Sequence, residues 1–269
     1  MKKITKKTTK KAQEYVNILG INILVTQEER LITSVKSFLS HNHHFYIVTP
    51  NPELVLASTK NPDLKRALND SDFSVPDGVG LRYASRFLYG KDLKIIPGRK
   101  LFEHLVAEAD KNKYKVFLLG GLDDEARAVG HKLKEKYKNL KIMSARGPIL
   151  NKKGQPDRDL DKELEKDTVD TINKFAPDIL FVAFGNPKQE IWIHDNLGKL
   201  RIGGAMAVGG TFRYLAGFSK LPPKWVEKMG LEWLWRLAKE PKRIGRILNA
   251  FPIFPLKVFF FKISHKTSR

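Results

Sequence analysis

Continuous apolar runs, rather than alternating ones, are the feature of this sequence that most constrains its fold. Such runs are "FYIV" (45–48), "VFLL" (116–119), "ILFVAF" (179–184) and "AMAV" (205–208), and "LKIMSARGP" contains a shorter strand. A strand that is apolar at every position is buried on both faces, as in a parallel sheet flanked by helices. Because helical patterns separate the runs, the sequence predicts an α/β fold with a Rossmann-like, mostly parallel sheet.

Length and composition narrow the class of protein further. A chain of 269 residues can bury the core of one large domain, with or without an appendage. The absence of cysteine excludes disulfides and thiolate metal sites. The basic N-terminus lacks an apolar signal-peptide region, and no apolar stretch of about 18 residues occurs, so we expect neither a signal peptide nor a transmembrane helix.

Positive charge is concentrated at the two ends of the chain. The net charge is +20; the first thirteen residues contain six Lys and no acid, and the residues from Phe218 onwards contain twelve Lys and Arg against three Glu. This asymmetry predicts a polyanionic partner, which could be a nucleic acid, an anionic membrane or a diphosphate. The N-terminal cluster is more typical of a solvated, disordered tail.

These patterns predict three regions. Residues 1–13 form a basic tail, residues 14–217 an α/β domain that would hold any active site, and residues 218–269 a helical appendage. The appendage is basic and aromatic, with a helix break expected at Pro241. Its segment "FPIFPLKVFFFKISHK" combines Phe and Lys in the way that suits an anionic membrane surface, although a core-packing tail or a dimer contact would use the same residues.

Polar or glycine-rich turns follow each of the main apolar runs. In open parallel sheets, ligands bind outside the carboxyl ends of the strands, glycine lets backbone N–H groups approach a phosphate, and helix N-termini favour anions. One glycine pair alone is as consistent with ordinary turn chemistry. Together the turns predict a ligand site, with the candidate residues Thr49, Asn51, Gly120, Gly121, Asn186, Lys188, Gln189, Glu190, Gly209 and Gly210.

Asp77 stands between Pro76 and Gly78, in a turn before an apolar helical pattern. A carboxylate at such a place is often the N-cap of the helix. It could instead be a general base that removes a proton from a sugar hydroxyl. The residues alone leave both interpretations open.

Metal sites have little support. Three acidic pairs match the D-x-D pattern by which many sugar transferases hold a cation: Asp70 with Asp72, Asp157 with Asp159, and Asp159 with Asp161. A separate cluster of possible ligands consists of His41, His43 and His44. Such short patterns recur by chance in acidic loops, and no carboxylate cluster accompanies the histidines. We therefore expect no metal and no cofactor.

The motifs taken together resemble the WecG/TagA/CpsF glycosyltransferases. They are "TPNPE", "PDGVG", "VFLLGG", "FGNPKQEIW", "AVGGTFRYLAG" and "PPKWVEKMGLEWLWRLAKEPKRIGR", in matching order over residues 20–250. The resemblance implies an inverting, metal-independent enzyme. Family members pass an N-acetylmannosamine-type sugar from UDP to a polyprenyl-diphosphate-linked sugar at the inner membrane surface.

The resemblance also implies roles for particular residues. Asp77 matches the catalytic base, Thr49 and Asn51 match pocket residues beside it, and Gln189 matches an active-site amide expected to point at the reacting sugar. The arginines of the appendage match residues thought to bind diphosphate and close the site; these are Arg236, Arg243 and Arg246. Without the resemblance they would be interpreted as a solvated basic face.

One departure from the family pattern concerns the sugar. Family members show Arg-x-x-Gly-x-Asp after the "PDG" helix, whereas Ile95 and Lys100 occupy those places around Gly98, with Lys94 and Arg99 beside them. The identity of the donor sugar therefore stays open, as do the acceptor and any homo-oligomer.

Two other functions remain possible from the residues. One is a nucleic-acid-binding α/β protein, suggested by the basic ends, although no recognised nucleic-acid motif occurs. The other is a non-catalytic scaffold that binds a UDP-sugar, suggested by the departure at Ile95 and Lys100. The favoured expectation is a cytoplasmic enzyme, peripheral on the inner face of the membrane, whose partners are a UDP-sugar and a polyprenyl-diphosphate acceptor.

Overall fold

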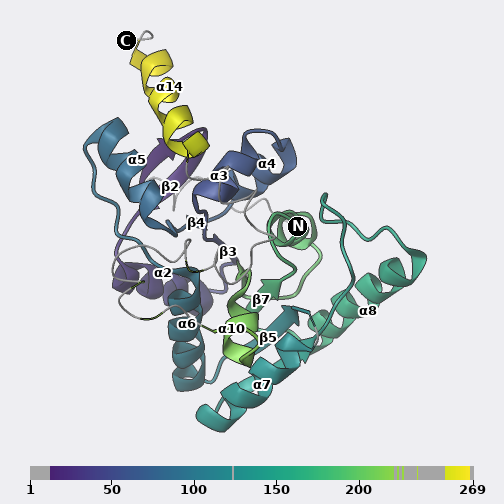
Figure 1. Cartoon of the computed structure of the whole chain (residues 1–269). Helices are drawn as coiled ribbons and strands as arrows, with labels where there is room; N and C mark the ends of the chain where they lie inside the picture. The colour runs from purple at the N-terminus through teal and green to yellow at the C-terminus, as the bar shows by residue number, and fades with distance from the viewer. Residues whose placement is uncertain are drawn as a thin grey trace.

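A six-stranded parallel sheet forms the centre of the molecule (Figure 1). The computed structural model describes residues 13–122, 124–220 and 252–266 and the single positions 223, 226 and 235. The strand order is β4-β3-β8-β7-β5-β6. The strands are β3 (Phe45–Val48), β4 (Phe73–Ser74), β5 (Lys115–Gly120), β6 (Lys141–Ala145), β7 (Ile179–Ala183) and β8 (Gly204–Ala207). The predicted fold class is confirmed.

Both faces of the sheet are covered by helices, which explains the continuous apolar runs. Successive side chains of a strand point to opposite faces, and in β3 the side chains of Tyr46 and Val48 join one core while those of Phe45 and Ile47 join the other. The first core includes side chains from α3 (Pro52–Ser58), α4 (Pro62–Asn69), α5 (Val79–Tyr89), α8 (Asp159–Phe175) and α9 (Lys188–Asn196). The second includes side chains from α2 (Glu28–Ser40), α6 (Gly98–Asn112), α7 (Glu125–Lys136) and α10 (Thr211–Ala216).

An antiparallel hairpin precedes the sheet and was not predicted. It pairs β1 (Glu14–Ile18) with β2 (Ile21–Val25). The turn residues Leu19 and Gly20 both have positive φ, 52° and 86°. Two-residue hairpin turns require this conformation and usually announce it with Asn-Gly or Asp-Gly. Because the first turn residue here is Leu and not Asn or Asp, the sequence does not indicate a hairpin.

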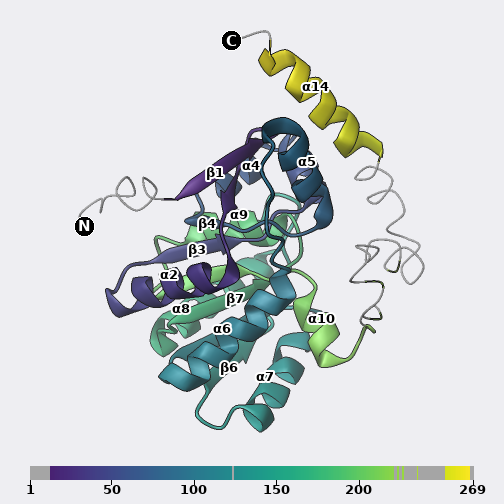
Figure 2. The ribbon, with the colours of Figure 1, turned by 90° about the vertical axis from the view of Figure 1, so that its left-hand side faces the viewer.

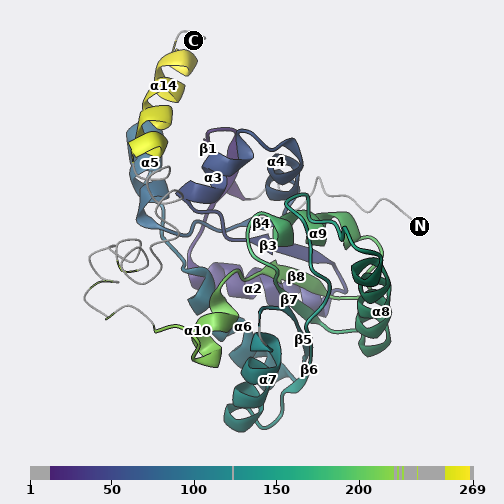
Figure 3. The ribbon, with the colours of Figure 1, turned by 45° about the vertical axis from the view of Figure 1, so that its right-hand side comes forward.

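The C-terminal helix α14 (Phe254–Lys266) lies against α5 and α3 (Figures 2 and 3). Phe254 and Val258 are each 3% exposed and belong to the core on that side of the sheet. This segment is therefore partly a packing element, as one interpretation of its sequence allows. The helices within the described part of the chain are too short or too polar to cross a bilayer.

Candidate active site

The predicted turns lie along one edge of the sheet, at the carboxyl ends of its strands. Along this rim, the Asp77 turn follows β4, Thr49 follows β3, Gly209 follows β8, Gly185 follows β7 and Gly121 follows β5. Neighbouring strands are about 4.8 Å apart, so the four intervals from β4 to β5 span roughly 19 Å. Turns that are far apart in the chain are thus side by side in space, in the place where open parallel sheets bind ligands.

Three segments converge around the Asp77 carboxylate. The Asp77 amide donates to the carbonyl of Pro50, at 2.9 Å, which ties the turn to the end of β3. The amide of Gly98, the first residue of α6, donates to Asp77 Oδ2 at 3.4 Å. A Cβ on Gly98 would lie 3.0 Å from Thr49 Oγ1, so Thr49 would have to shift by a few tenths of an ångström to accept any larger residue there. A helix N-terminus is a favourable neighbour for a negative charge.

The N-cap interpretation of Asp77 is wrong. The N-cap of α5 is Gly78, with φ of 99° and no side-chain capping bond. This φ lies in a region that residues with a side chain rarely adopt. The Asp77 side chain is half-buried and directed to the start of α6 instead.

Asn51 borders the same turn from the β3 side. It is the N-cap of α3, where its Oδ1 accepts from the Leu54 amide at 2.9 Å. A Cβ on Gly78 would lie 3.9 Å from the Asn51 Cβ. The capping bond therefore fixes the Asn51 side chain beside the Asp77 turn.

The Gln189 side chain ties the turn after β7 to the turn after β8. It is 2% exposed. Its Oε1 accepts from the amides of Gly185 at 3.2 Å and Gly209 at 3.1 Å. Its Nε2 donates to Asn186 Oδ1 at 2.6 Å and Glu190 Oε1 at 2.8 Å. These four contacts hold the two turns together, and the role at the reacting sugar that the resemblance implies for this amide stays a prediction.

Substituting Gln189 with Leu should loosen this part of the rim. The amides of Gly185 and Gly209 would lose their acceptor, and a buried unpaired polar group costs about 1–3 kcal/mol. We expect a lower free energy of unfolding and weaker binding of UDP, measured by urea denaturation and calorimetry. The exposed Gln155 is the matched control, because Gln155→Leu leaves the rim intact. A Gln189→Leu protein as stable as wild type would contradict this role.

Glu190 is a buried acid beneath Gln189. It is 2% exposed, and its Oε2 has no partner within the described part of the chain. Burial raises the pKa of Glu190 to about 7. The phenol of Tyr46 donates to the Glu190 backbone carbonyl at 3.0 Å, and burial raises the Tyr46 pKa, with the charges of Glu190 and Asp195 adding to the effect. Because Glu190 Oε1 accepts from Gln189 Nε2, this buried acid helps to hold the Gln189 side chain in place.

The other predicted turn residues have clear structural contacts. Lys188 Nζ donates to the Leu150 carbonyl at 3.0 Å. Gly120 and Gly121 have φ of 95° and 83°, and the Gly121 amide donates to the Ala183 carbonyl at 3.0 Å, which joins the turn after β5 to β7. Gly210 is the N-cap of α10. The positive φ of Gly120 and Gly121 explains the glycines in the turn after β5, whereas Gly210 has an ordinary φ of −79°.

The departure from the family pattern lies beside Asp77. The Ile96 amide donates to the Pro76 carbonyl at 3.0 Å, so the segment containing Ile95 borders the Asp77 turn. Ile95 is half-buried and Lys100 is exposed. Arg99 pairs with Glu103 at 2.9 Å.

The three arginines predicted to bind diphosphate, Arg236, Arg243 and Arg246, lie outside the described residues.

The acidic pairs considered as metal ligands have structural partners. Asp72 Oδ2 accepts from the Tyr46 amide at 2.9 Å, and Asp70 pairs with His194 at 3.0 Å. Asp161 accepts from the Ile149 amide at 2.9 Å, and Asp159 pairs with Lys162 at 2.9 Å. No group of three His, Asp or Glu residues arranged to hold a cation occurs in the part of the chain that the structure describes.

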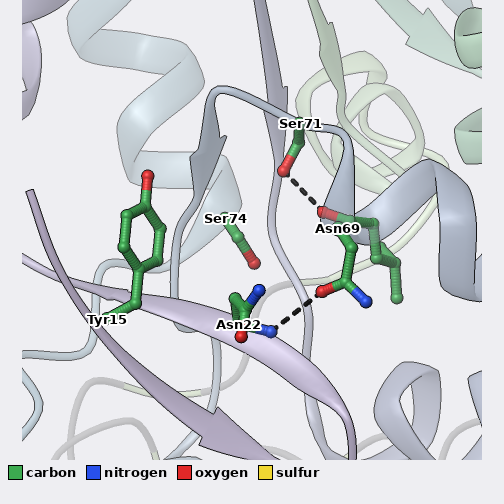
Figure 4. A pocket seen from close by; sticks show the side chains of 6 residues that line it. Tyr15, Asn22, Asn69, Ser71 and Ser74 are labelled. Carbon is green, nitrogen blue, oxygen red and sulfur yellow. Dashed lines mark hydrogen bonds between the residues drawn. The ribbon is translucent and has the colours of Figure 1, made fainter. Parts of the chain in front are cut away.

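A cavity of about 210 Å³ lies elsewhere, between the hairpin, α4 and β4 (Figure 4). The Asn22 amide donates to Asn69 Oδ1 at 3.0 Å, and Ser71 Oγ donates to the Leu68 carbonyl at 2.7 Å. Tyr15 and Ser74 complete its lining, so it contains none of the residues predicted for the site. The close approach of the Thr49, Asp77 and Gly98 segments, and not this cavity, marks the candidate site.

Comparison with known proteins shows the family to which the chain is related. The model of the glycosyl transferase WecG/TagA/CpsF family matches residues 16–268. An N-acetylglucosaminyldiphosphoundecaprenol N-acetyl-beta-D-mannosaminyltransferase of Staphylococcus aureus strain MRSA252 is 33% identical over 248 residues, which cover 90% of this chain and 91% of the relative. Proteins of the same description from strains MW2 and NCTC 8325 are 32% identical over 246 residues, with the same coverage.

Proposed function

Because the chain belongs to the WecG/TagA/CpsF family of glycosyltransferases, we propose that it transfers an N-acetylmannosamine-type sugar from UDP to a polyprenyl-diphosphate-linked N-acetylglucosamine. The relatives' names supply both the sugar and the acceptor. The observation that carries the proposal is the Asp77 carboxylate on the rim, which accepts from the amide of Gly98, a residue that also adjoins Thr49. The product would serve cell-wall or exopolysaccharide synthesis.

Asp77 acts as the general base in this proposal. It removes the proton of the acceptor hydroxyl while that oxygen bonds to the anomeric carbon of the donor. The bond from that carbon to UDP breaks in the same step, and its electron pair leaves with the diphosphate. A single displacement inverts the anomeric carbon, so one carboxylate suffices and no second, nucleophilic carboxylate is required.

The glycine turns would receive the diphosphate of UDP. A turn without Cβ atoms lets a phosphate come close to the backbone, and the turns after β8 and β5 contain adjacent glycines, Gly209 with Gly210 and Gly120 with Gly121. The amides of Gly209 and Gly121 already donate within the protein, so the diphosphate would lie against these turns without using those two donors. Thr49 and Asn51 border the Asp77 turn and would contact the reacting sugar. Arg236, Arg243 and Arg246 would add charge by binding phosphate oxygens through their guanidinium groups.

Catalysis is proposed to need no metal. Amides and guanidinium groups supply the stabilisation of the leaving diphosphate that a cation supplies elsewhere. We expect transfer to continue unchanged in excess EDTA, measured as UDP release against a magnesium-supplemented control. A loss of turnover that added magnesium restores would contradict metal independence.

The proposed location is the cytoplasmic face of the cell membrane. A polyprenyl chain stays in the bilayer, so an enzyme acting on its diphosphate-linked sugar must reach the membrane surface. The basic, aromatic C-terminal segment would provide this contact. The enzyme would then associate with the membrane peripherally.

A panel of UDP-sugars with a short-chain polyprenyl-diphosphate-N-acetylglucosamine analogue tests the function. We expect UDP release that requires the acceptor, and a disaccharide product with an inverted anomeric carbon. UDP binding without transfer to any lipid acceptor would favour a scaffold. Salt-dependent binding of nucleic acid without binding of UDP would favour the nucleic-acid alternative, which the family does not support.

A further inference from the structure

Helices α5 and α14 together present an exposed apolar surface. It comprises Tyr83 and Phe87 of α5 and Leu256, Phe259, Phe260 and Ile263 of α14, each between 44% and 64% exposed. The rings of Phe87 and Phe259 stack across the two helices, with centroids 6.3 Å apart and planes inclined by 27°. The helices lie side by side in Figures 2 and 3. We call these six residues the α5–α14 surface.

The surface continues from the C-terminal helix onto the α/β domain because α14 is anchored there. Phe254 and Val258 are buried against the core. Lys257 Nζ donates to Thr59 Oγ1, at 3.1 Å, at the end of α3. Lys262 Nζ lies 4.1 Å from the centroid of the Phe87 ring and also donates to the Phe87 carbonyl. The catalytic domain itself thus supplies part of the exposed apolar area.

The two helices are cationic as well as apolar. Their sequences contain Arg82, Arg86, Lys257, Lys262 and Lys266 and neither Asp nor Glu. Asp92, which follows α5, accepts from Arg82 at 2.6 Å and from Arg86 at 2.7 Å, and it offsets part of this charge. Aromatic and aliphatic side chains with flanking Lys and Arg suit the interface of a membrane that contains anionic lipid.

We propose that the α5–α14 surface seats the protein on an anionic bilayer, with helix α5 of the catalytic domain making direct contact with lipid. This inference rests on the proposed function. Helix α5 begins two residues after Asp77, so a bilayer against α5 and α14 sets the orientation of the Asp77 turn relative to the headgroups. The diphosphate and sugar of a lipid-linked acceptor would lie at that level.

A second copy of the chain fits this surface less well. A two-fold dimer would place the same cationic face of each copy against the other, and like charges at close distance repel. An anionic bilayer meets the same surface with opposite charge. The measurement below separates the two occupants.

The test is co-flotation of the full chain with vesicles, using the double variant Tyr83→Ser with Phe87→Ser. Vesicles of phosphatidylglycerol with phosphatidylcholine are compared with phosphatidylcholine alone. We expect wild type to bind the anionic vesicles, and the double variant to bind them at least about tenfold more weakly, because two apolar side chains no longer enter the interface. Leu160→Ser on α8 is the control, since Leu160 is 71% exposed and lies outside the surface.

Turnover separates this inference from the proposed function. In the double variant, transfer to acceptor embedded in vesicles should fall with binding, while transfer to a water-soluble short-chain acceptor stays at the wild-type rate. If the double variant is unstable, Leu256→Ser with Phe260→Ser tests the same surface on α14. Unchanged vesicle binding of a stable Tyr83→Ser, Phe87→Ser variant would overturn the inference, because α5 would then make no contact with lipid. A wild-type dimer that these changes dissociate, with vesicle binding unchanged, would also overturn it. Absence of transfer in wild type would refute the proposed function. Vesicle binding in the flotation assay would still decide whether the α5–α14 surface binds lipid.

Discussion

Replacing Asp77 with Asn is expected to lower the turnover number by roughly 10²–10⁴-fold, the range associated with a lost general base. Asparagine keeps the size of the side chain and one oxygen that can accept from the Gly98 amide, so the turn should stay in place. What is lost is the ability to take a proton from the acceptor hydroxyl. The measurement is UDP release at saturating donor and acceptor, with UDP affinity and the unfolding midpoint measured in parallel.

Asp63→Asn is the control for this change. Asp63 is an exposed carboxylate on α4 that pairs with Arg66 on the surface, so its loss should leave turnover unchanged. A Asp77→Asn enzyme with near-normal turnover would remove Asp77 from the role of base. A fall in turnover together with a large loss of stability would indicate a structural role instead.

The second large effect concerns the pH dependence of stability, through Glu190. The pKa of Glu190 is about 7 in the folded protein, against 4.5 for the unperturbed group. Below pH 4.5 the side chain is protonated in both states. Between these values the folded state retains a proton that the unfolded state has released, so stability falls as pH rises. The contribution lost by pH 8 is about 3 kcal/mol, since one pKa unit corresponds to about 1.4 kcal/mol.

Glu190→Gln should remove the loss of unfolding free energy that the ionisation of Glu190 causes as pH rises. Its amide oxygen can still accept from Gln189, and it cannot ionise. Relative to wild type, the variant should therefore gain about 3 kcal/mol of unfolding free energy between pH 4.5 and pH 8, measured by urea denaturation across that range. Glu163→Gln, at an exposed position on α8, should run parallel to wild type. Parallel curves for Glu190→Gln and wild type would show that Glu190 ionises normally.

The sheet was largely predictable from sequence, whereas its small additions were not. Strands such as β5 and β7 are buried on both faces, and this leaves a continuous apolar run that few other elements produce. Strand β4 comprises only Phe73 and Ser74, too few residues for any periodicity. The hairpin was missed because its turn residues, Leu19 and Gly20, do not match the usual pair.

The positions of the candidate residues along one edge of the sheet were predictable from sequence, whereas the directions of their side chains were not. Parallel strands bring their carboxyl ends to one edge, so the proximity of the turns follows from the order of strands and helices. The sequence "KQE" at 188–190 looks exposed, yet α9 packs into the core and buries Gln189 and Glu190. The contact of Asp77 with Gly98 joins segments 21 residues apart, and only the folded chain reveals it.

A co-crystal structure of the full chain with UDP tests the central claim most directly. UDP is predicted to lie along the rim at the carboxyl ends of β3, β8, β7 and β5, with its diphosphate at the glycine turns and its terminal phosphate towards Asp77. UDP bound in the cavity beside Tyr15 and Asn69, or anywhere that leaves Asp77 remote from the phosphate, would contradict the account.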